Sequence, residues 1–302
     1  MSDCTHDCSS CGESCAERQE GSPFQIKPLR EGCRVGKVYG VVSGKGGVGK
    51  SMVTSQLAVT MQRRGHNVAV LDADITGPSI PKMFGMSGRH VHALGNLMLP
   101  EISEHGVKVM SSNLLLQNET DPVLWRGPVI AGAIRQFWSE TSWGPIDYLL
   151  VDMPPGTGDI QLTLSQQVPL TGAVVVTTPQ DIALIDAKKG LRMFQKVNVP
   201  ILGIIENMSV FICPHCGEVE HIFGEGGAKR MSEQYGVPLL GELPLSAKIR
   251  EQADSGLPTV AAEPDGKEAL MYREMAMKVA GALARITKDY TAKMPGIRVV
   301  ND

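Results

Sequence analysis

Short apolar runs alternate with longer amphipathic stretches along most of the chain, beginning at Lys37. The runs are apolar at successive positions, which is typical of strands buried on both faces of a parallel sheet. They predict strands over Val38–Ser43, Val68–Asp72, Val107–Ser111, Tyr148–Asp152, Ala173–Thr178, Ile201–Asn207 and Leu239–Leu243. The amphipathic stretches predict helices over Ser51–Arg64, Ile130–Trp138, Ile160–Val168, Ile182–Val197, Ala228–Tyr235, Ala247–Ser255 and Lys267–Asp289. This order predicts an α/β fold, a doubly wound, mainly parallel sheet with helices on both faces.

Both ends of the chain depart from this pattern. Residues 1–34 are polar, cysteine-rich and without periodicity, so we predict an N-terminal metal-binding segment over 1–34, an α/β domain over 35–290 and a tail over 291–302. The last predicted helix is apolar at Met271, Met275, Val279, Leu283 and Ile286. A membrane-binding helix is one interpretation of this face. Packing on the sheet is favoured, because the polar face is not unusually basic and the chain continues to Asp302.

Composition and charge narrow the class of protein. The chain has 302 residues and a net charge of −3, with 42% hydrophobic and 20% charged residues, which is ordinary for a globular protein. No block of lysine or arginine is present, so we expect no nucleic acid as a partner. No apolar segment follows Met1 and the longest apolar runs are strand-sized, so we expect no membrane association. These features favour a cytoplasmic protein.

A glycine-rich run between the first predicted strand and helix fits the phosphate-binding loop motif G-x-x-x-x-G-K-[ST] of P-loop NTPases. Its glycines let backbone N–H groups turn toward phosphate oxygens, and the start of the helix adds partial positive charge. Lys50 is expected to reach the β- and γ-phosphates, and the Ser51 hydroxyl to ligate Mg²⁺. The predicted nucleotide-binding residues are therefore Gly44, Lys45, Gly46, Gly47, Val48, Gly49, Lys50 and Ser51.

Polar residues also follow three other predicted strands. Asp72 and Asp74 end the second strand, where paired carboxylates facing a phosphate loop act on Mg²⁺ or on an attacking water; a helix cap is the alternative for either residue. Asp152 ends the fourth strand, as an Mg²⁺-binding acid does, and Gly156 after it suits a loop that senses the γ-phosphate. Asn207 suits a hydrogen bond to the base, with a plain turn residue as the alternative.

The seven cysteines indicate reduced thiols and metal ligation rather than disulfides. Cys213 and Cys216 form a C-P-x-C-G turn, and two such turns across a two-fold axis would supply four sulfurs, to Zn²⁺ or to a [4Fe–4S] cluster equally well. An N-terminal group would suit an iron–sulfur cluster, a zinc ion or a flexible thiol tail; its members are Cys4, Cys8, Cys11 and Cys15. Cys33 has no partner in sequence, so we expect it to take no part.

The motifs together resemble one family, the Mrp-type iron–sulfur carrier ATPases, over about Lys37 to Pro258. The motifs that carry the resemblance are GKGGVGKS (Gly44–Ser51), LDADITGPSIP (Leu71–Pro81), WRGP (Trp125–Pro128), VDMPPGTGD (Val151–Asp159), ENMS (Glu206–Ser209) and CPHCG (Cys213–Gly217). Lys45 also resembles the extra lysine of the MinD, ParA and nitrogenase iron-protein group. The resemblance implies a homodimer that binds and slowly hydrolyses ATP with Mg²⁺, holds a [4Fe–4S] cluster and passes it to apo-proteins.

The same resemblance implies roles for single residues. Lys45 would act in trans on the partner's nucleotide, Asp74 near the attacking water and Asp152 as the switch acid, and these three are the implied catalytic residues. Asn207 would contact adenine, while Cys213 and Cys216 would be paired thiolates at the dimer interface. The N-terminal cysteines depart from the family's spacing. Two other functions remain as alternatives: a MinD- or ParA-like positioning ATPase, and an ATP-gated electron donor similar to the nitrogenase iron protein.

Overall fold

A computed structural model describes residues 26–95, 97–116, 118 and 127–287 of the chain. The predicted N-terminal metal ligands lie outside these residues, as does the predicted tail over 291–302. So does the first half of the WRGP motif, Trp125 and Arg126.

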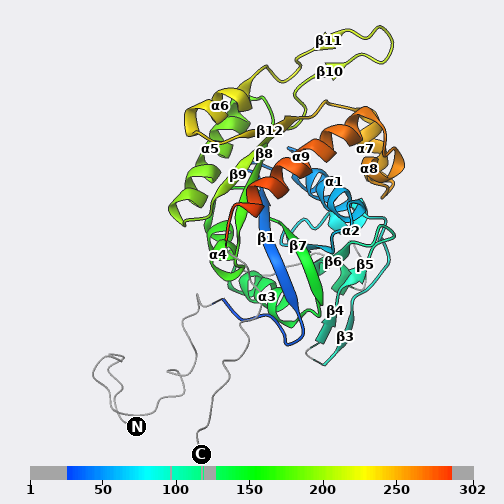
Figure 1. Ribbon diagram of the computed structural model, residues 1–302, viewed down its shortest axis with the longest axis vertical. Helices are drawn as coiled ribbons and strands as arrows, with labels where there is room; N and C mark the ends of the chain where they lie inside the picture. The colour runs from blue at the N-terminus through cyan, green and yellow to red at the C-terminus, as the bar shows by residue number, and fades with distance from the viewer. Residues whose placement is uncertain (1–25, 96, 117, 119–126, 288–302) are drawn as a thin grey trace, which may run out of the picture.

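One eight-stranded sheet organises the molecule, in the order β12-β9-β8-β1-β7-β2-β6-β5 (Figure 1). Every neighbouring pair is parallel except β5 with β6. All seven predicted strands are present, and β5 is an addition at the edge. The strands are β1 (Arg34–Val42), β2 (Val68–Asp72), β5 (Glu101–Ile102), β6 (Lys108–Met110), β7 (Pro145–Asp152), β8 (Gly172–Thr177), β9 (Ile201–Glu206) and β12 (Leu239–Glu242).

The longer helices follow the prediction, with shorter elements between them. The helices are α1 (Lys50–Arg63), α2 (Ile80–Met83), α3 (Gly127–Glu140), α4 (Asp159–Gln167), α5 (Asp181–Lys196), α6 (Gly227–Tyr235), α7 (Ala247–Asp254), α8 (Thr259–Ala262) and α9 (Lys267–Ala284), with a 3₁₀ helix over Ser112–Leu115. Two small hairpins pair β3 (His92–Leu94) with β4 (Leu97–Leu99), and β10 (Phe211–Ile212) with β11 (Val219–Glu220). The sequence did not predict α2, α8 or the hairpins, because elements this short do not show a hydrophobic period.

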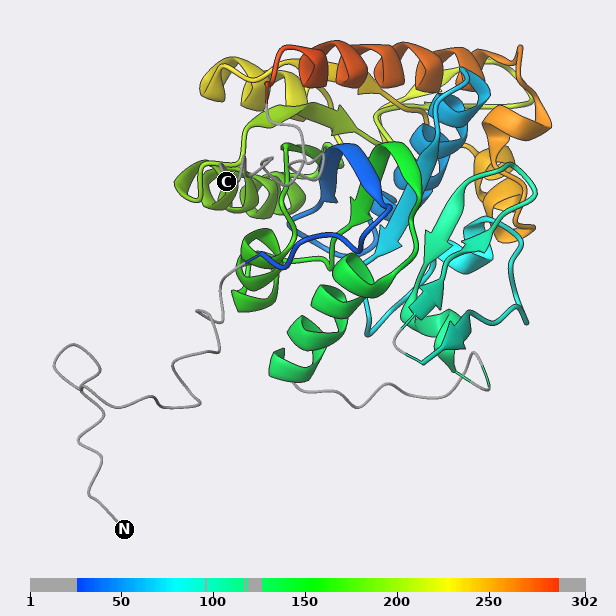
Figure 2. The same cartoon turned by 60° about the horizontal axis from the view of Figure 1, so that its bottom comes forward.

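Alternate side chains of the strands enter two separate hydrophobic cores. In β8, Ala173 and Val175 face one core, whereas Val174 and Val176 face the other. Against the strand side chains, α3, α4, α5 and α6 contribute to the first core, and α1, α2, α8 and α9 contribute to the second. Figure 2 shows the two groups of helices on opposite sides of the sheet. The predicted doubly wound architecture is therefore confirmed.

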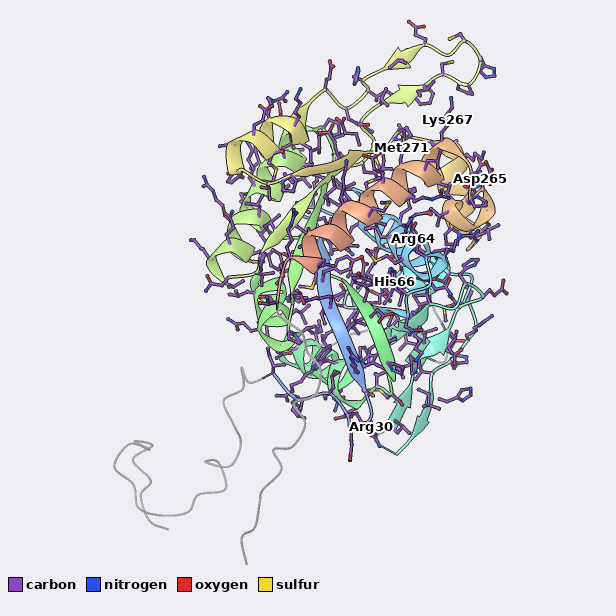
Figure 3. All side chains as sticks on the ribbon, in the orientation of Figure 1. Arg30, Arg64, His66, Asp265, Lys267 and Met271 are labelled. Carbon is purple, nitrogen blue, oxygen red and sulfur yellow. The ribbon has the colours of Figure 1, made fainter. Side chains whose placement is uncertain are left out.

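The apolar face of α9 packs on the sheet, as predicted. Met275, Val279 and Leu283 are buried in the second core, whereas Met271 is 39% exposed on the outer side of the helix (Figure 3). The helix ends at Ala284, short of the predicted Asp289. No helix among the described residues is long and apolar enough to cross a membrane.

The stretch that leads into β1 also packs against the α/β body. The indole of Trp138 donates a hydrogen bond to the Lys27 carbonyl (2.9 Å), and Leu29 contacts the first core. Cys33 is buried, with its thiol 3.8 Å from the Thr141 carbonyl. Residues that the composition assigned to the N-terminal segment thus contribute to the body, and Cys33 is a core side chain.

Candidate functional site

The carboxyl ends of the central strands bring the predicted site residues together. Asp152 at the end of β7 is in register with Asp72 on β2 and with Val41 on β1. Since β1 leads into the glycine-rich loop, both acids lie at the edge of the sheet where that loop begins. Ligands of open α/β sheets bind at such an edge.

Close packing requires glycine at two positions of the loop. A Cβ on Gly44 would lie 2.2 Å from the backbone carbon of Asp186 in α5. A Cβ on Gly49 would lie 2.2 Å from Nδ2 of Asn207, and Gly49 also has φ +82°. The loop is therefore packed tightly between α5 and the end of β9, with α1 starting directly after it.

Lys50, Ser51 and Asp152 form a buried polar cluster. Lys50 Nζ and Ser51 Oγ each lie 2.6 Å from Asp152 Oδ2. Thr54, one turn further along α1, donates to Asp152 Oδ1 at 2.6 Å. Lys50 is only 6% exposed and Asp152 is fully buried. An ion pair in this setting is tolerated only when hydrogen bonds satisfy the remaining lone pairs, and the two hydroxyls do so here.

Thr54 is a site residue that the sequence analysis missed. Its position one helical turn after Lys50 places both residues on the same face of α1, so the helical period held the signal. The motif itself ends at Ser51, which is why the pattern alone did not extend to Thr54.

Asp72 and Asp74 occupy different environments. Asp72 is fully buried and accepts hydrogen bonds from the Ser111 hydroxyl (3.1 Å), the Ile80 N–H (3.3 Å) and the Asp74 N–H (3.2 Å). Burial, and then the nearby Asp152 carboxylate, raise the pKa of Asp72 to about 8, with Lys50 acting in the opposite direction. Asp74 is partly buried, lines the cleft beside the loop, and has a pKa raised chiefly by burial. Asp72 thus holds the start of α2, and Asp74 faces the cleft.

The raised pKa of Asp72 predicts a pH dependence of the ligand-free fold. The unfolded chain releases this proton near the ordinary value of 3.8, whereas the folded chain keeps it up to about pH 8. The stabilisation from Asp72 is therefore complete below about pH 4 and is lost as the pH rises through about 8. We expect the free energy of unfolding to fall over this range more steeply in the native chain than in Asp72→Asn.

Urea unfolding with EDTA and without nucleotide measures this difference, and Asp265→Asn on the surface is the control. Equal pH slopes for the native chain and Asp72→Asn would contradict the assignment.

A cleft of about 250 Å³ opens beside the loop, and a second hollow of about 240 Å³ adjoins it. Gly49, Met52 and Met83 line both. The second hollow is largely apolar and is lined further by Asn207, Met208, Pro244, Leu245 and Ile249, among others. A cleft that presents Lys50, Ser51 and Asp74 and is joined to an apolar pocket suits a ligand with a phosphate tail and an aromatic base.

Asn207 lines the second hollow and contacts the loop. It is buried, and its side-chain amide donates to the Val48 carbonyl of the loop at 2.9 Å. The structure therefore places Asn207 against the loop and beside the apolar pocket. The amide N–H of Asn207 therefore bonds the loop. The strand pattern did not predict this hydrogen bond.

Lys45 differs from Lys50 in exposure and partners. Its side chain is exposed at the rim of the cleft. It forms no ion pair with any described carboxylate. The charge of Lys45 is thus available to a group that approaches the loop from outside.

Cys213 and Cys216 lie on the turn of the β10–β11 hairpin, which projects from the body (Figure 1). The Gly217 N–H donates to the Cys213 carbonyl (2.9 Å), closing the turn. Cys216 is exposed and Cys213 is partly exposed. Backbone N–H groups of Cys216 and His215 lower the pKa of the Cys213 thiol, which favours the thiolate that binds metals. Across the described part of the chain, no three metal-binding side chains cluster, so one chain offers two thiols here.

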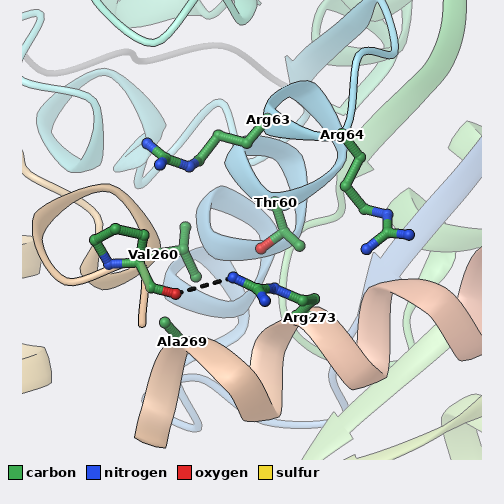
Figure 4. A pocket seen from close by; sticks show the side chains of 7 residues that line it. Thr60, Arg63, Arg64, Val260, Ala269 and Arg273 are labelled. Carbon is green, nitrogen blue, oxygen red and sulfur yellow. Dashed lines mark hydrogen bonds between the residues drawn. The ribbon is translucent and has the colours of Figure 1, made fainter. Parts of the chain in front are cut away.

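A separate hollow of about 280 Å³ lies between the end of α1 and α9 and is lined by three arginines. Arg63 and Arg64 point to opposite sides of it, and Arg273 donates to the Pro264 carbonyl at 3.0 Å (Figure 4). The three guanidinium groups do not converge, so this hollow lacks the geometry of an anion site.

Comparisons with known proteins match nearly the whole α/β body. The family model described as ParA, NUBPL iron-transfer P-loop NTPase, matches residues 34–280. The iron-sulfur cluster carrier protein of Pseudomonas fragi is 52% identical over 244 residues, 80% of this chain and 85% of that protein. The protein of the same description from Escherichia coli K12 is 50% identical over 249 residues, 82% of this chain and 67% of its own length.

Solved structures show the same fold. A nucleotide-binding protein from Archaeoglobus fulgidus, in complex with ADP, is 39% identical and has a TM-score of 0.68, covering 78% of this chain and 91% of that one. The septum site-determining protein MinD from Pyrococcus horikoshii, complexed with Mg-ADP, is 23% identical with a TM-score of 0.61, covering 83% of this chain and 99% of that one. The second similarity concerns the fold alone.

Proposed function

The chain belongs to the ParA-type family of NUBPL iron-transfer P-loop NTPases, and from this premise we propose that it is an ATP-hydrolysing carrier of iron–sulfur clusters. The cargo is a cluster, [4Fe–4S] by the family resemblance, held by Cys213 and Cys216. The cluster passes from these thiols to apo-proteins that need it. Hydrolysis of ATP in the cleft beside the glycine-rich loop is coupled to that transfer.

One observation carries this proposal: a single short segment joins the nucleotide site to the thiols. Asn207 directly follows β9 and donates to the Val48 carbonyl of the loop. The chain then runs through Ser209, whose N–H and hydroxyl both bond the Leu243 carbonyl, into the hairpin that bears Cys213. Few residues therefore separate the loop from the cargo thiols, and this short connection is what supports coupling between nucleotide and cluster.

The residues of the cleft fit ATP and Mg²⁺. Lys50 supplies the ammonium for the β- and γ-phosphates, and Ser51 with Asp152 supplies the oxygen ligands that Mg²⁺ prefers. When bound, the metal would neutralise charge that develops on the phosphates. In the present arrangement Lys50 is paired with Asp152, so phosphate binding requires Lys50 to turn toward the ligand. Thr54 would keep its hydrogen bond to Asp152 during that exchange.

A second copy of the chain is the partner that we propose for the loop face. Three large apolar side chains near the loop are exposed: Ile160 on α4, and Ile182 and Ile185 on α5. Ile185 precedes Asp186, whose backbone contacts Gly44. An apolar rim of this kind, beside a lysine that pairs with no carboxylate in the described part of the chain, suits a self-complementary two-fold interface. Such a dimer would also bring two pairs of thiols to one cluster.

Replacing Lys45 with alanine should leave ATP binding largely intact and depress hydrolysis. The reason is its place at the exposed rim of the cleft, where it is suited to stabilise charge on a partner's nucleotide. Arginine fingers that act in this way contribute on the order of 10³–10⁵ in rate, and a slow enzyme would show a smaller loss. Phosphate release at saturating ATP measures the effect, and Lys229→Ala, an exposed lysine on α6, is the control. Normal hydrolysis and normal dimerisation in Lys45→Ala would mean that Lys45 is only a solvated residue.

Cluster transfer is the activity that tests the carrier function. The protein is reconstituted with iron and sulfide without oxygen, and is then mixed with an apo-enzyme that regains activity only when it receives a cluster. Recovery that exceeds the recovery with free iron and sulfide supports a carrier. Reduction of a redox acceptor without cluster loss would instead support the electron-donor alternative.

A further inference from the structure

Gln161, on the first turn of α4, connects two parts of the nucleotide site. Its side-chain amide donates to the Pro154 carbonyl (2.5 Å), in the loop after Asp152, and lies 3.4 Å from the Ser43 carbonyl, where the glycine-rich loop begins. Gln161 is buried, at 2% exposure, and so is Ser43. A buried amide that bonds both segments fixes their relative position.

The Ser43 carbonyl receives a second donor from the same loop. The Gly156 N–H donates to it at 3.0 Å. Gly156 has φ +107°, a conformation that L-residues rarely adopt, and a Cβ there would meet nothing within 4 Å. The glycine is therefore needed for its backbone freedom and not for space. Pro155, the residue before it, lines the cleft beside the phosphate loop, so the peptide that carries this N–H borders the nucleotide site.

Two polar atoms beside this arrangement are buried without a hydrogen-bond partner among the described residues. They are the Gln161 carbonyl oxygen Oε1 and the Ser43 hydroxyl Oγ. Unpaired buried polar atoms are uncommon and call for an explanation. Such atoms also occur elsewhere among the described residues, Gln167 Oε1 included, so what distinguishes this place is the Ser43 carbonyl, which the Gln161 amide and the Gly156 N–H share.

We propose that Gln161 is a positioning residue for the γ-phosphate, acting through the Ser43 carbonyl; this inference rests on the proposed ATPase function. When ATP enters, the Gly156 N–H turns from Ser43 toward the γ-phosphate. The Gln161 amide then remains as the donor to the Ser43 carbonyl, which would otherwise be buried and unsatisfied. ADP has no γ-phosphate, so with ADP the Gly156 N–H stays on Ser43. Gln161 thus favours ATP over ADP without touching either nucleotide.

The ratio of ATP affinity to ADP affinity tests this inference. Gln161→Met keeps the length of the side chain and removes the donor. The net contribution of one hydrogen bond corresponds to a factor of roughly 2 to 10, so the ratio should fall by that factor while ADP affinity stays near the native value. Gln161→Glu should lower the ratio at least as much, because its carboxylate would face two carbonyl oxygens. Calorimetry with ADP and with a non-hydrolysable ATP analogue provides both affinities.

Gln167→Met is the matched control, because Gln167 is also a buried glutamine, at the opposite end of α4. Its ATP-to-ADP ratio should equal that of the native chain. Equal weakening of ATP and ADP in both Gln161 variants would show a structural role only and would overturn the inference, as would an unchanged ratio. A native chain that binds neither nucleotide would overturn the proposed function itself, a result distinct from the other two.

Discussion

A Lys50→Ala variant should lose binding of ATP and ADP by a factor on the order of 100 or more. Lys50 is the cation at the base of the cleft, and hydrogen bonds to charged groups are about twice as strong as neutral ones. Calorimetric titration with each nucleotide measures the loss. The exposed Lys248, which pairs with Glu263 on the surface, supplies the control variant Lys248→Ala. Native nucleotide affinity in Lys50→Ala would contradict the nucleotide site.

The same substitution should also destabilise the ligand-free fold. Asp152 is fully buried and would keep only the hydroxyls of Ser51 and Thr54 as donors. Leaving one partner of a buried ion pair uncompensated costs about 3–5 kcal/mol. A Lys50→Ala, Asp152→Asn double variant removes both charges, so it should recover part of the stability without recovering nucleotide binding. Recovery of both would mean that the loss of binding came from misfolding.

Replacing Cys213 and Cys216 together with alanine should abolish a cluster shared by two chains and weaken the dimer. One chain offers two thiols at the hairpin, whereas a closed site or a cluster takes four ligands. The simplest source of the other two is the same pair in a second copy. Both thiols lie on a projecting turn and not in the core, so the substitution should leave the unfolding midpoint of the ligand-free chain unchanged.

The measurement is iron, sulfide and zinc per chain in protein purified without oxygen, together with the mass of the assembly. The four N-terminal cysteines offer another place for metal, so they are replaced by serine in both the reference chain and the variant. Cys33→Ala controls for loss of any thiol, since Cys33 is buried against Thr141 far from the hairpin in sequence. One cluster for every two chains, lost with Cys213 and Cys216, supports the bridge. One metal centre in each single chain, or a variant that keeps its metal, would refute the bridge between two chains.

Local patterns predicted the sheet and the loop because their physical causes are local. A run such as Ala173–Val176 is apolar at every position, and only a strand covered on both faces buries all of it. The glycines of the phosphate loop lie between such a strand and a helix, so the motif and its setting agree in the sequence. For the same reason the apolar face of α9 was visible, and its burial against the sheet followed the pattern.

Other features depend on neighbours that are distant in the chain. Thr54 and Lys50 meet Asp152 across about a hundred residues, at separations of 98 and 102. Asn207 meets Val48 across 159 residues. No local sequence pattern relates residues that are so far apart along the chain. They follow from the order of the strands, which places the ends of β1, β7 and β9 at one edge.

Local sequence patterns were enough to predict the seven longer strands of the sheet, the phosphate loop and the pair of thiols, because hydrophobic period, glycine spacing and cysteine spacing involve neighbouring residues. They did not predict β5 or the two short hairpins. Which acid is buried and which faces the cleft depends on the tertiary structure, since Asp72 and Asp74 are the same residue type two positions apart. The two hydrogen bonds of Gln161, to the Ser43 and Pro154 carbonyls, also depend on the tertiary structure. In the sequence, an amphipathic helix pattern does not distinguish Gln161 from any other glutamine on a buried face. Burial and hydrogen-bond partners are properties of packed surroundings, and packing brings together segments that the sequence keeps apart.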